Sequence, residues 1–281
     1  MTFRFNKLSG IMGAEIHDFD SKQMHSDKDL NFIQDLFYQH QFLVFRNQNL
    51  TPEEQIKFCQ RFGKIVLHPL KEVPWKYREI TYVANINLEG ELFETCGPTF
   101  ELWHSDTCYL SQPAKMSFLY AEKVPAKHGE TLFANMYQAY RDLPVDLQNK
   151  IEGKKAIFGS SYKLMKRCQD RGYPLHINEE DMCPDVEHPV VRTHPVTKQK
   201  SIYVNWAHTD SIVGMNPSES DEILDYLYRH CRQEKYIYTH NYQQGDLVVW
   251  DNASTIHSNC EGKLTEPRIM RRVMIEGPVP A

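Results

Sequence analysis

A histidine two residues before an aspartate can hold a metal ion when the pair lies on a strand. Residues two apart on a strand point to the same side of the sheet, so His104 and Asp106 of the segment ELWHSDTCYL would face one ion together. Two histidines and one carboxylate are the ligand set that holds Fe(II) in non-haem oxygenases, and this set leaves positions open for substrate and oxygen. The chain must supply one more histidine.

The His-x-acid spacing is weak evidence on its own. With 13 His and 37 acidic residues in 281 positions, about 13 × 37/281 ≈ 1.7 matches arise by chance. The chain has four matches: His25/Asp27, His104/Asp106, His128/Glu130 and His208/Asp210. The first lies at an expected helix start, where its acids have a capping role, and the third has the composition of a turn. His208 follows a strand-like run without a third ligand nearby, which makes it a candidate substrate contact.

His257 is the expected third ligand because its surroundings also carry charge. It follows the strand-like run DLVVWDN and precedes the run RIMRR. In the second run Arg268 and Arg272 share one face of a period-2 strand, whereas Arg271 points away. Guanidinium groups on one face indicate an anion site, since the planar fork of arginine matches a carboxylate or sulfonate. A surface strand with solvated arginines is the alternative.

The elements that must position these residues are mainly strands. Capping boxes at Ser26/Asp29 and Thr51/Glu54 predict two early helices around the strand-like run FLVF, the second ending at Gly63. Two later helices are expected before Gly153 and after Asn216. Strand-like runs dominate from residue 80 onward: ITYVANI, MSFLYAEKV, TLFANM, SIYVNW, YIYTHNY, DLVVWD and RIMRRVMIEG. These patterns predict a mainly antiparallel β fold with flanking helices.

Length and composition predict one folded domain over residues 1–281. The chain has 41% apolar and 25% charged residues, which is enough to bury a core. Residues 159–190 are rich in charge, Ser, Cys and Pro and lack a clear period, so they predict an insertion that could serve as a lid. The seven scattered cysteines include no CxxC pair and are expected to be reduced thiols.

Charge and hydropathy indicate a small-molecule partner. The net charge is −5, and no long basic run appears, which argues against nucleic acid or an anionic membrane as a partner. No window approaches the roughly 18 consecutive apolar residues of a membrane span, and the first residues lack the apolar core of a secretory signal. A cytoplasmic location is therefore expected.

The same residues resemble a known family. WHSD at 103–106, GDLVVWDN at 245–252, His257 and the arginines eleven and fifteen positions after it look like the taurine dioxygenase and 2,4-dichlorophenoxyacetate dioxygenase family. The resemblance also covers FLVFRNQNLTPEEQIKFCQRFG, LHP at 67–69, HGETLFANM and HPVVRTHP, and so nearly the whole chain. It implies a double-stranded β-helix (jelly roll, cupin-like core). It also implies His104, Asp106 and His257 as ligands of Fe(II), with 2-oxoglutarate and O2 as co-substrates.

Further roles follow from the resemblance by position. Arg268 is similar to the arginine that pairs with the distal carboxylate of 2-oxoglutarate, and Thr131 to the threonine that hydrogen-bonds the same group. Arg272 resembles the residue that anchors the anionic head of the primary substrate, and His68 a histidine of the substrate pocket. The implied reaction is hydroxylation, with or without cleavage of a carbon–heteroatom bond, and releases succinate and CO2.

Departures from taurine dioxygenase bear on the substrate. Phe100 stands where that enzyme has an asparagine, and His208 replaces a phenylalanine of its taurine pocket. A carboxylate substrate is therefore favoured over a sulfonate. Tyr77, Tyr162 and Lys163 could add polar contacts, although ordinary exposed loop residues are the favoured interpretation of all three.

Two other functions stay open at this point. The same scaffold could perform biosynthetic oxidation, such as desaturation or isonitrile formation from an N-substituted amino acid. A non-enzymatic jelly roll that binds an anion or a metal is the second alternative, and the complete triad with both arginines argues against it. The resemblance also implies a homodimer or homotetramer.

Overall fold

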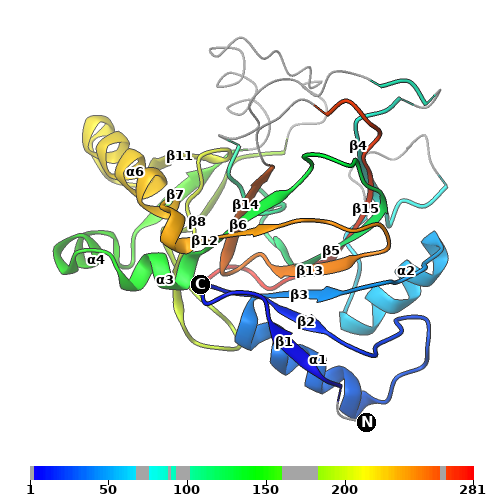
Figure 1. Cartoon of the computed structure of the whole chain (residues 1–281). Helices are drawn as coiled ribbons and strands as arrows, with labels where there is room; N and C mark the ends of the chain where they lie inside the picture. Colours follow the sequence, from blue (N-terminus) through cyan, green and yellow to red (C-terminus); the bar gives the residue numbers. More distant parts are fainter. Residues whose placement is uncertain (1–2, 68–75, 88–89, 93–101, 160–182, 260–263) are drawn as a thin grey trace.

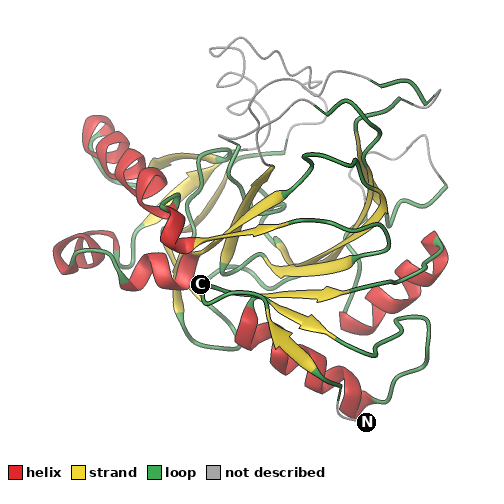
Figure 2. Cartoon of the chain, in the orientation of Figure 1, coloured by secondary structure: helices red, strands yellow, loops and turns green. Residues whose placement is uncertain are grey.

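The computed structural model describes residues 3–67, 76–87, 90–92, 102–159, 183–259 and 264–281. Within these residues strands form the centre and helices lie at the periphery (Figure 2). The largest sheet has the order β1-β2-β3-β13-β5-β15-β4. Its strands are β1 Phe5–Lys7, β2 Ala14–Ile16, β3 Phe42–Phe45, β4 Thr81–Ala84, β5 Ala114–Lys123, β13 Leu247–Asp251 and β15 Ile269–Glu276. All its neighbouring strands pair antiparallel except β2 and β3, which are parallel.

Smaller sheets complete the β structure. One has the order β12-β6-β14, a second β11-β7-β8, and a third pairs β10 with β9. Their strands are β6 Thr131–Asn135, β7 Lys155–Phe158, β8 Val186–Pro189, β9 Val191–Thr193, β10 Lys200–Ile202, β11 Thr209–Ile212, β12 Ile237–His240 and β14 Thr255–Asn259. The jelly roll expected from the sequence is confirmed: the largest sheet and the β12-β6-β14 sheet are its two sides (Figure 1).

The two faces of the largest sheet have different partners because side chains alternate along each strand. On one face Phe45, Phe118 and Val249 belong to a core that also contains residues of α1 (Asp27–His40) and α2 (Pro52–Cys59). On the other face Val44, Leu119 and Val248 pack with Phe133 of β6. Every residue of β3 is buried, as expected for a strand covered on both sides.

Four helices begin where the sequence predicts them, whereas α3 Met136–Arg141 was not predicted. Ser26 and Thr51 cap α1 and α2, and both capping boxes are complete. The second helix ends at Cys59 and continues as a 3-10 turn, η1 Gln60–Phe62, up to Gly63. A second group of helices covers the opposite side of the molecule (Figure 1): α3 Met136–Arg141, α4 Val145–Ile151 and α6 Pro217–Cys231, with the 3-10 turn η4 Glu234–Tyr236 following α6.

Two expectations about regular structure need correction. The segment 159–190 was predicted to leave the sheet, but Val186–Pro189 forms β8 and pairs with β7. Residues 160–182 lie outside the described part of the chain, so the lid stays a prediction. The run SIYVNW is a strand only at Lys200–Ile202, because residues 203–206 leave the ladder and turn toward His208.

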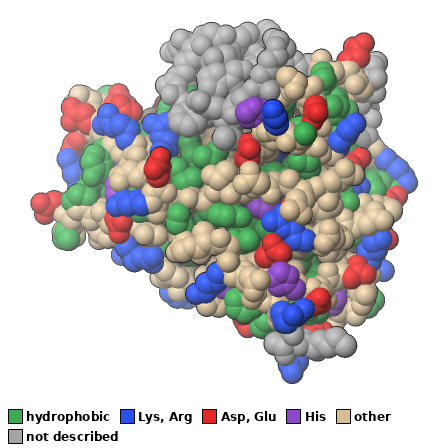
Figure 3. Space-filling model, viewed as in Figure 1, with side chains coloured by type: hydrophobic (Ala, Val, Ile, Leu, Met, Phe, Trp, Pro, Cys, Tyr) green, Lys and Arg blue, Asp and Glu red, His purple; other side chains and the backbone are tan. Residues whose placement is uncertain are grey.

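The face of the molecule drawn in Figure 3 has no large patch of a single charge sign among its described residues. Lysine and arginine side chains alternate with acidic ones there (Figure 3). Of the helices that the structure describes, none combines the length and apolar character required to cross a bilayer.

Candidate active site

His104 and His257 are brought together by the backbone. The N–H of His104 donates to the carbonyl of His257 over 3.0 Å, and the N–H of His257 donates back over 2.8 Å. Residues directly opposite each other in an antiparallel pair project from the same face. The two imidazole centroids accordingly lie 4.2 Å apart, with the rings of Trp250 and Phe133 packed against His257.

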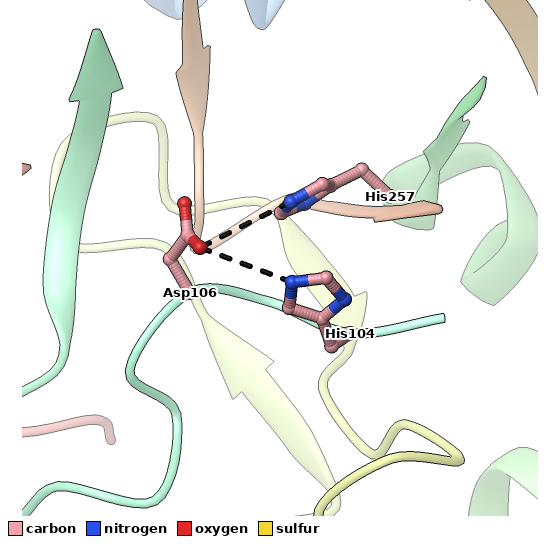
Figure 4. Close-up of side chains that lie close together, drawn as sticks. All are labelled: His104, Asp106 and His257. Atoms are coloured by element: carbon pink, nitrogen blue, oxygen red, sulfur yellow. Dashed lines mark ion pairs between the residues drawn. The ribbon is translucent and has the colours of Figure 1, made fainter. Parts of the chain in front are cut away.

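Asp106 completes the cluster from the turn that follows His104. Its Oδ1 lies 3.9 Å from His104 Nε2 and 4.0 Å from His257 Nε2. The three ligand atoms all lie within 4.8 Å of one another, and the side chains converge from two segments of the chain (Figure 4). The predicted ligands therefore meet at one point.

The hydrogen bond of His104 to Leu102 leaves Nε2 of the imidazole free to bind a metal ion. Its Nδ1 lies 2.7 Å from the carbonyl oxygen of Leu102, and because a carbonyl only accepts, Nδ1 carries the proton. The lone pair is then on Nε2, the atom that faces Asp106. Nδ1 of His257 is buried without a hydrogen-bond partner among the described residues.

Burial and neighbouring charges keep the three groups in the forms that ligate metals. Burial, together with the neighbouring His104, lowers the pKa of His257 to about 3. Burial also lowers the pKa of His104. Burial by itself raises the pKa of Asp106, but Arg272 and the two imidazoles outweigh it, and the pKa falls to about 2. At neutral pH both imidazoles are uncharged and the carboxylate is ionised, as metal binding requires.

A buried polar network holds the other side of Asp106. Ser117 on β5 donates to Asp106 Oδ2 over 2.5 Å. Ser117 Oγ in turn accepts from Nδ2 of Asn252 over 2.8 Å. The side-chain oxygen of Asn252 accepts from the Asp106 backbone N–H and from the indole N–H of Trp250. Asn252, the last residue of the GDLVVWDN motif, thus ties the ligand turn to the strand β13.

Arg272 lies inside the cluster and Arg271 outside it, as the period of β15 predicts. Nη1 of Arg272 is 2.6 Å from Asp106 Oδ1. Arg271 packs on the helix-covered face, where its guanidinium lies over the ring of Tyr120 and donates to the carbonyl of Leu50. Arg271 is buried there. Arg268 is buried as well and Arg272 is paired with Asp106, so the alternative of a surface strand with solvated arginines is wrong.

Arg268 and Thr131 share a neighbour that the sequence did not indicate. The hydroxyl of Tyr242 donates to Thr131 Oγ1 over 3.1 Å, and the Arg268 guanidinium carbon lies 5.4 Å from the centroid of the Tyr242 ring. Arg268 is held by a bond from Nε to the carbonyl of Gly129. Tyr242 lies beyond β12 in the run YIYTHNY, where alternation suggested only a strand.

His208 lies beside the cluster of His104, Asp106 and His257, and its role as a substrate contact stays a prediction. Its ring centroid is 6.3 Å from that of His104 and 4.9 Å from that of Tyr109. Burial raises the pKa of Tyr109 to about 12, and the charge of Arg272 opposes that rise. The phenol is therefore close enough to Arg272 to interact with its charge. Tyr109 follows the WHSD motif by three residues, and a period-2 reading of that segment did not single it out.

Five other candidate residues remain. His68, Phe100, Tyr162 and Lys163 lie outside the described residues. Tyr77 is described: its hydroxyl bonds to Glu53 of α2, and its ring packs against the core beneath the largest sheet. Its role as a substrate contact stays a prediction. Trp103 and Trp250 are core residues.

The donor set fits iron. Two neutral imidazole nitrogens and one carboxylate oxygen form the 2-His-1-carboxylate triad that suits non-haem Fe(II). Asp106 is further oriented by Ser117, the kind of supporting contact that ligating carboxylates have. The residues that would hold the ion are His104, Asp106 and His257.

Comparisons with known proteins agree with this site. Residues 4–274 match the model of the family described as taurine catabolism dioxygenase TauD, TfdA family. The chain is 30% identical to the alpha-ketoglutarate-dependent 2,4-dichlorophenoxyacetate dioxygenase of Cupriavidus pinatubonensis, over 95% of each chain. It is 31% identical to the (S)-phenoxypropionate/alpha-ketoglutarate-dioxygenase of Sphingobium herbicidovorans, over 95% of this chain and 91% of that one.

A solved structure shows the same fold with ligands bound. The chain superimposes on AAD-2 in complex with Mn(II) and N-oxalylglycine with a TM-score of 0.88 and 27% identity, covering 100% of this chain and 99% of the other. With the match to the family model, this likeness settles the classification. The chain belongs to the TauD/TfdA family of dioxygenases, which depend on Fe(II), 2-oxoglutarate and O2.

Proposed function

We propose that the protein hydroxylates a small organic carboxylate, with cleavage of a carbon–heteroatom bond where the hydroxylated carbon carries one. The observation that carries this proposal is the placement of Arg272, whose guanidinium reaches the Asp106 carboxylate at the metal-ligating cluster. A cation at that distance from the ligands would hold an anionic substrate with its C–H bond close to the reacting centre. When bound, iron supplies oxygen activation, coupled to conversion of 2-oxoglutarate to succinate and CO2.

The protein contributes position, charge and exclusion of water. Arg268 would pair with the distal carboxylate of 2-oxoglutarate, and Thr131 would hydrogen-bond the same group. Tyr242 supports both, because its hydroxyl bonds to Thr131 and its ring lies under Arg268. Arg272 would bind the anionic head of the primary substrate.

The wall made by His208 and Tyr109 favours a carboxylate with a flat or unsaturated group. The two rings lie 4.9 Å apart beside the ligands, and such rings stack well on another ring. The relatives named above act, by their names, on 2,4-dichlorophenoxyacetate and on (S)-phenoxypropionate. A phenoxyalkanoate is therefore the first substrate class to test.

The test is a screen for succinate release. Purified protein is loaded anaerobically with Fe(II), 2-oxoglutarate and one candidate, and is then exposed to oxygen. Phenoxyacetate and 2-phenoxypropionate should release succinate in amounts equal to product, and matched sulfonates should release less. The D106A variant is the control and should release none above background.

Product analysis decides between the rival functions. Phenol with glyoxylate from phenoxyacetate would show hydroxylation followed by cleavage. An alkene or isonitrile from an N-substituted amino acid would instead show biosynthetic oxidation. If no small acid increases succinate release and D106A binds ligands as well as the wild type does, the enzymatic proposal is wrong.

A further inference from the structure

Arg272 contacts the oxygen of Asp106 that also faces both imidazoles. Its Nη1 is 2.6 Å from Oδ1, and the Nε2 atoms of His104 and His257 are 3.9 and 4.0 Å from the same Oδ1. A carboxylate oxygen that a guanidinium already occupies is a poorer ligand, because its lone pairs and its negative charge are shared. The positive charge of Arg272 also repels a metal cation at close range.

Asp106 does not need Arg272 to stay in position. Ser117 donates to the other oxygen, Oδ2, over 2.5 Å, and Asn252 supports Ser117 over 2.8 Å. Ser117 and Asn252 are almost completely buried, at 0% and 1% exposure. The two oxygens of Asp106 therefore have separate partners: Ser117 orients the carboxylate, and Arg272 competes for the oxygen that faces the imidazoles.

Arg272 also has a donor left over. Its Nε is buried and has no hydrogen-bond partner in the described part of the chain. A buried donor without a partner is unfavourable, so an anion that accepts from it gains affinity. Since Nη1 is engaged with Asp106, the edge of the guanidinium that carries Nε, unpaired among the described residues, is the edge left to bind a carboxylate.

We propose that Arg272 couples the substrate site to the metal site through Asp106. Without substrate, the guanidinium weakens metal binding by holding Oδ1 and by its charge. An anion on the Nε edge neutralises that charge and relaxes the hold on Oδ1, so the metal binds more tightly. Coupling between two binding sites is reciprocal, so the metal raises the affinity for the anion by the same factor. Arg272 thus sets the affinity for the metal as well as anchoring the substrate.

This inference rests on the proposed function, because it takes His104, Asp106 and His257 as metal ligands and Arg272 as the substrate anchor. Its distinctive consequence concerns the protein without substrate. Removing the guanidinium should strengthen metal binding, whereas removing the hydroxyl that orients Asp106 should weaken it. Substitutions at two residues that contact the same carboxylate should therefore act in opposite directions.

Titration with Mn(II), followed by the electron paramagnetic resonance signal of the free ion, tests this without turnover. R272Q should bind Mn(II) about fivefold or more tightly than the wild type, at the lower end of typical coupling factors. S117A should bind it about tenfold more weakly, as expected for loss of a supporting contact, and D106A should not bind it. R272Q that binds Mn(II) equally or more weakly than the wild type would overturn the proposal.

Additional arms separate the possible failures. If R272Q fails to fold by circular dichroism, R272M decides the question, because methionine has a similar length and neither a charge nor a donor: it should bind Mn(II) more tightly than the wild type, and equal or weaker binding overturns the coupling. If the wild-type protein does not bind Mn(II), or binds it no better than D106A does, the assignment of the metal ligands is wrong and the coupling is wrong with it. Phenoxyacetate should tighten Mn(II) binding in the wild type and not in R272Q. No effect on the wild type would reject phenoxyacetate as the anion, and the R272Q result would still decide the coupling.

Discussion

His104 and His257 exchange both backbone hydrogen bonds, over 3.0 and 2.8 Å, although they lie in distant parts of the sequence. The bridge is isolated: it lies outside the named strands at the His104 end. Two main-chain bonds therefore set the spacing of the two imidazoles, and the side chains need only their rotamers to face Asp106. The nitrogen ligands are held by the fold itself, as a preorganised site requires.

Substitution of either histidine should remove activity without unfolding the protein. H104A and H257A should each lower succinate formation by at least about 100-fold, because the metal loses one of three protein ligands. The backbone bridge does not use the imidazoles, so both metal-free variants should still fold, and H257A should melt lower than H104A because it loses the ring that packs against Trp250 and Phe133. A variant that keeps more than a tenth of the activity would contradict the ligand assignment.

Arg268 should control the affinity for 2-oxoglutarate. R268Q should raise the KM for 2-oxoglutarate by about 10- to 100-fold, since hydrogen bonds to a charged group contribute about 1.5–3 kcal/mol. Y242F should raise it less, because it removes only the hydroxyl that supports Thr131. R271Q is the matched control three residues further along the chain: the guanidinium of Arg271 lies over Tyr120 on the opposite face of the sheet, so this KM should not change. Equal effects of R268Q and R271Q would argue against the assignment.

Stability of the metal-free protein should fall on acidification because of His257. Its pKa is lowered to about 3 in the folded protein and is about 6.5 in an unfolded chain. The stabilisation is therefore fully present above about pH 6.5. Below that pH, His257 becomes protonated in the unfolded chain but stays uncharged in the folded protein. The free energy of unfolding therefore falls by up to about 1.4 kcal/mol per pH unit between pH 6.5 and pH 3.

Urea unfolding of the metal-free wild type and of H257Q at pH 7.5, 6.5 and 5.5 measures this contribution. The free energy of unfolding of H257Q should depend less on pH, because one depressed titration is gone. Parallel pH profiles for the two proteins would show that His257 is protonated to the same degree in both states.

His208 should shape substrate choice. H208F removes a polar ring from the wall that it forms with Tyr109 and introduces the residue type found in taurine dioxygenase. The ratio of kcat/KM for phenoxyacetate over a matched sulfonate should fall by about fivefold or more, a difference of roughly 1 kcal/mol in the transition state. An unchanged ratio would remove His208 from the substrate pocket.

The capping box of α1 offers a stability test away from the site. Ser26 accepts from the backbone N–H of Asp29, and its own backbone N–H donates to the Asp29 carboxylate. S26A should lower the free energy of unfolding by about 1 kcal/mol and leave both KM values unchanged. A change in KM without a change in stability would contradict this separation of roles.

The sequence alone was sufficient for what depends on neighbours along the chain. Capping residues marked the starts of α1 and α2, β-rich runs marked β3 to β6, β12, β13 and β15 but not β14, which carries His257, and the period of β15 put Arg272 on one face and Arg271 on the other. It also supplied the three expected ligands, because their residue types and motif context matched a known family. The SIYVNW run and the start of β8 were misjudged, since strand ends depend on which partner is available for pairing.

Tertiary structure alone decided which groups touch. The bond of Arg272 to the Oδ1 of Asp106, the support of that carboxylate by Ser117 and Asn252, and the place of Tyr242 beneath Arg268 follow from sheet register and the packing of distant strands. No local pattern carries such information, because a hydrogen bond requires its atoms to lie within about 3 Å, and only the assembled jelly roll brings segments so distant in sequence that close together.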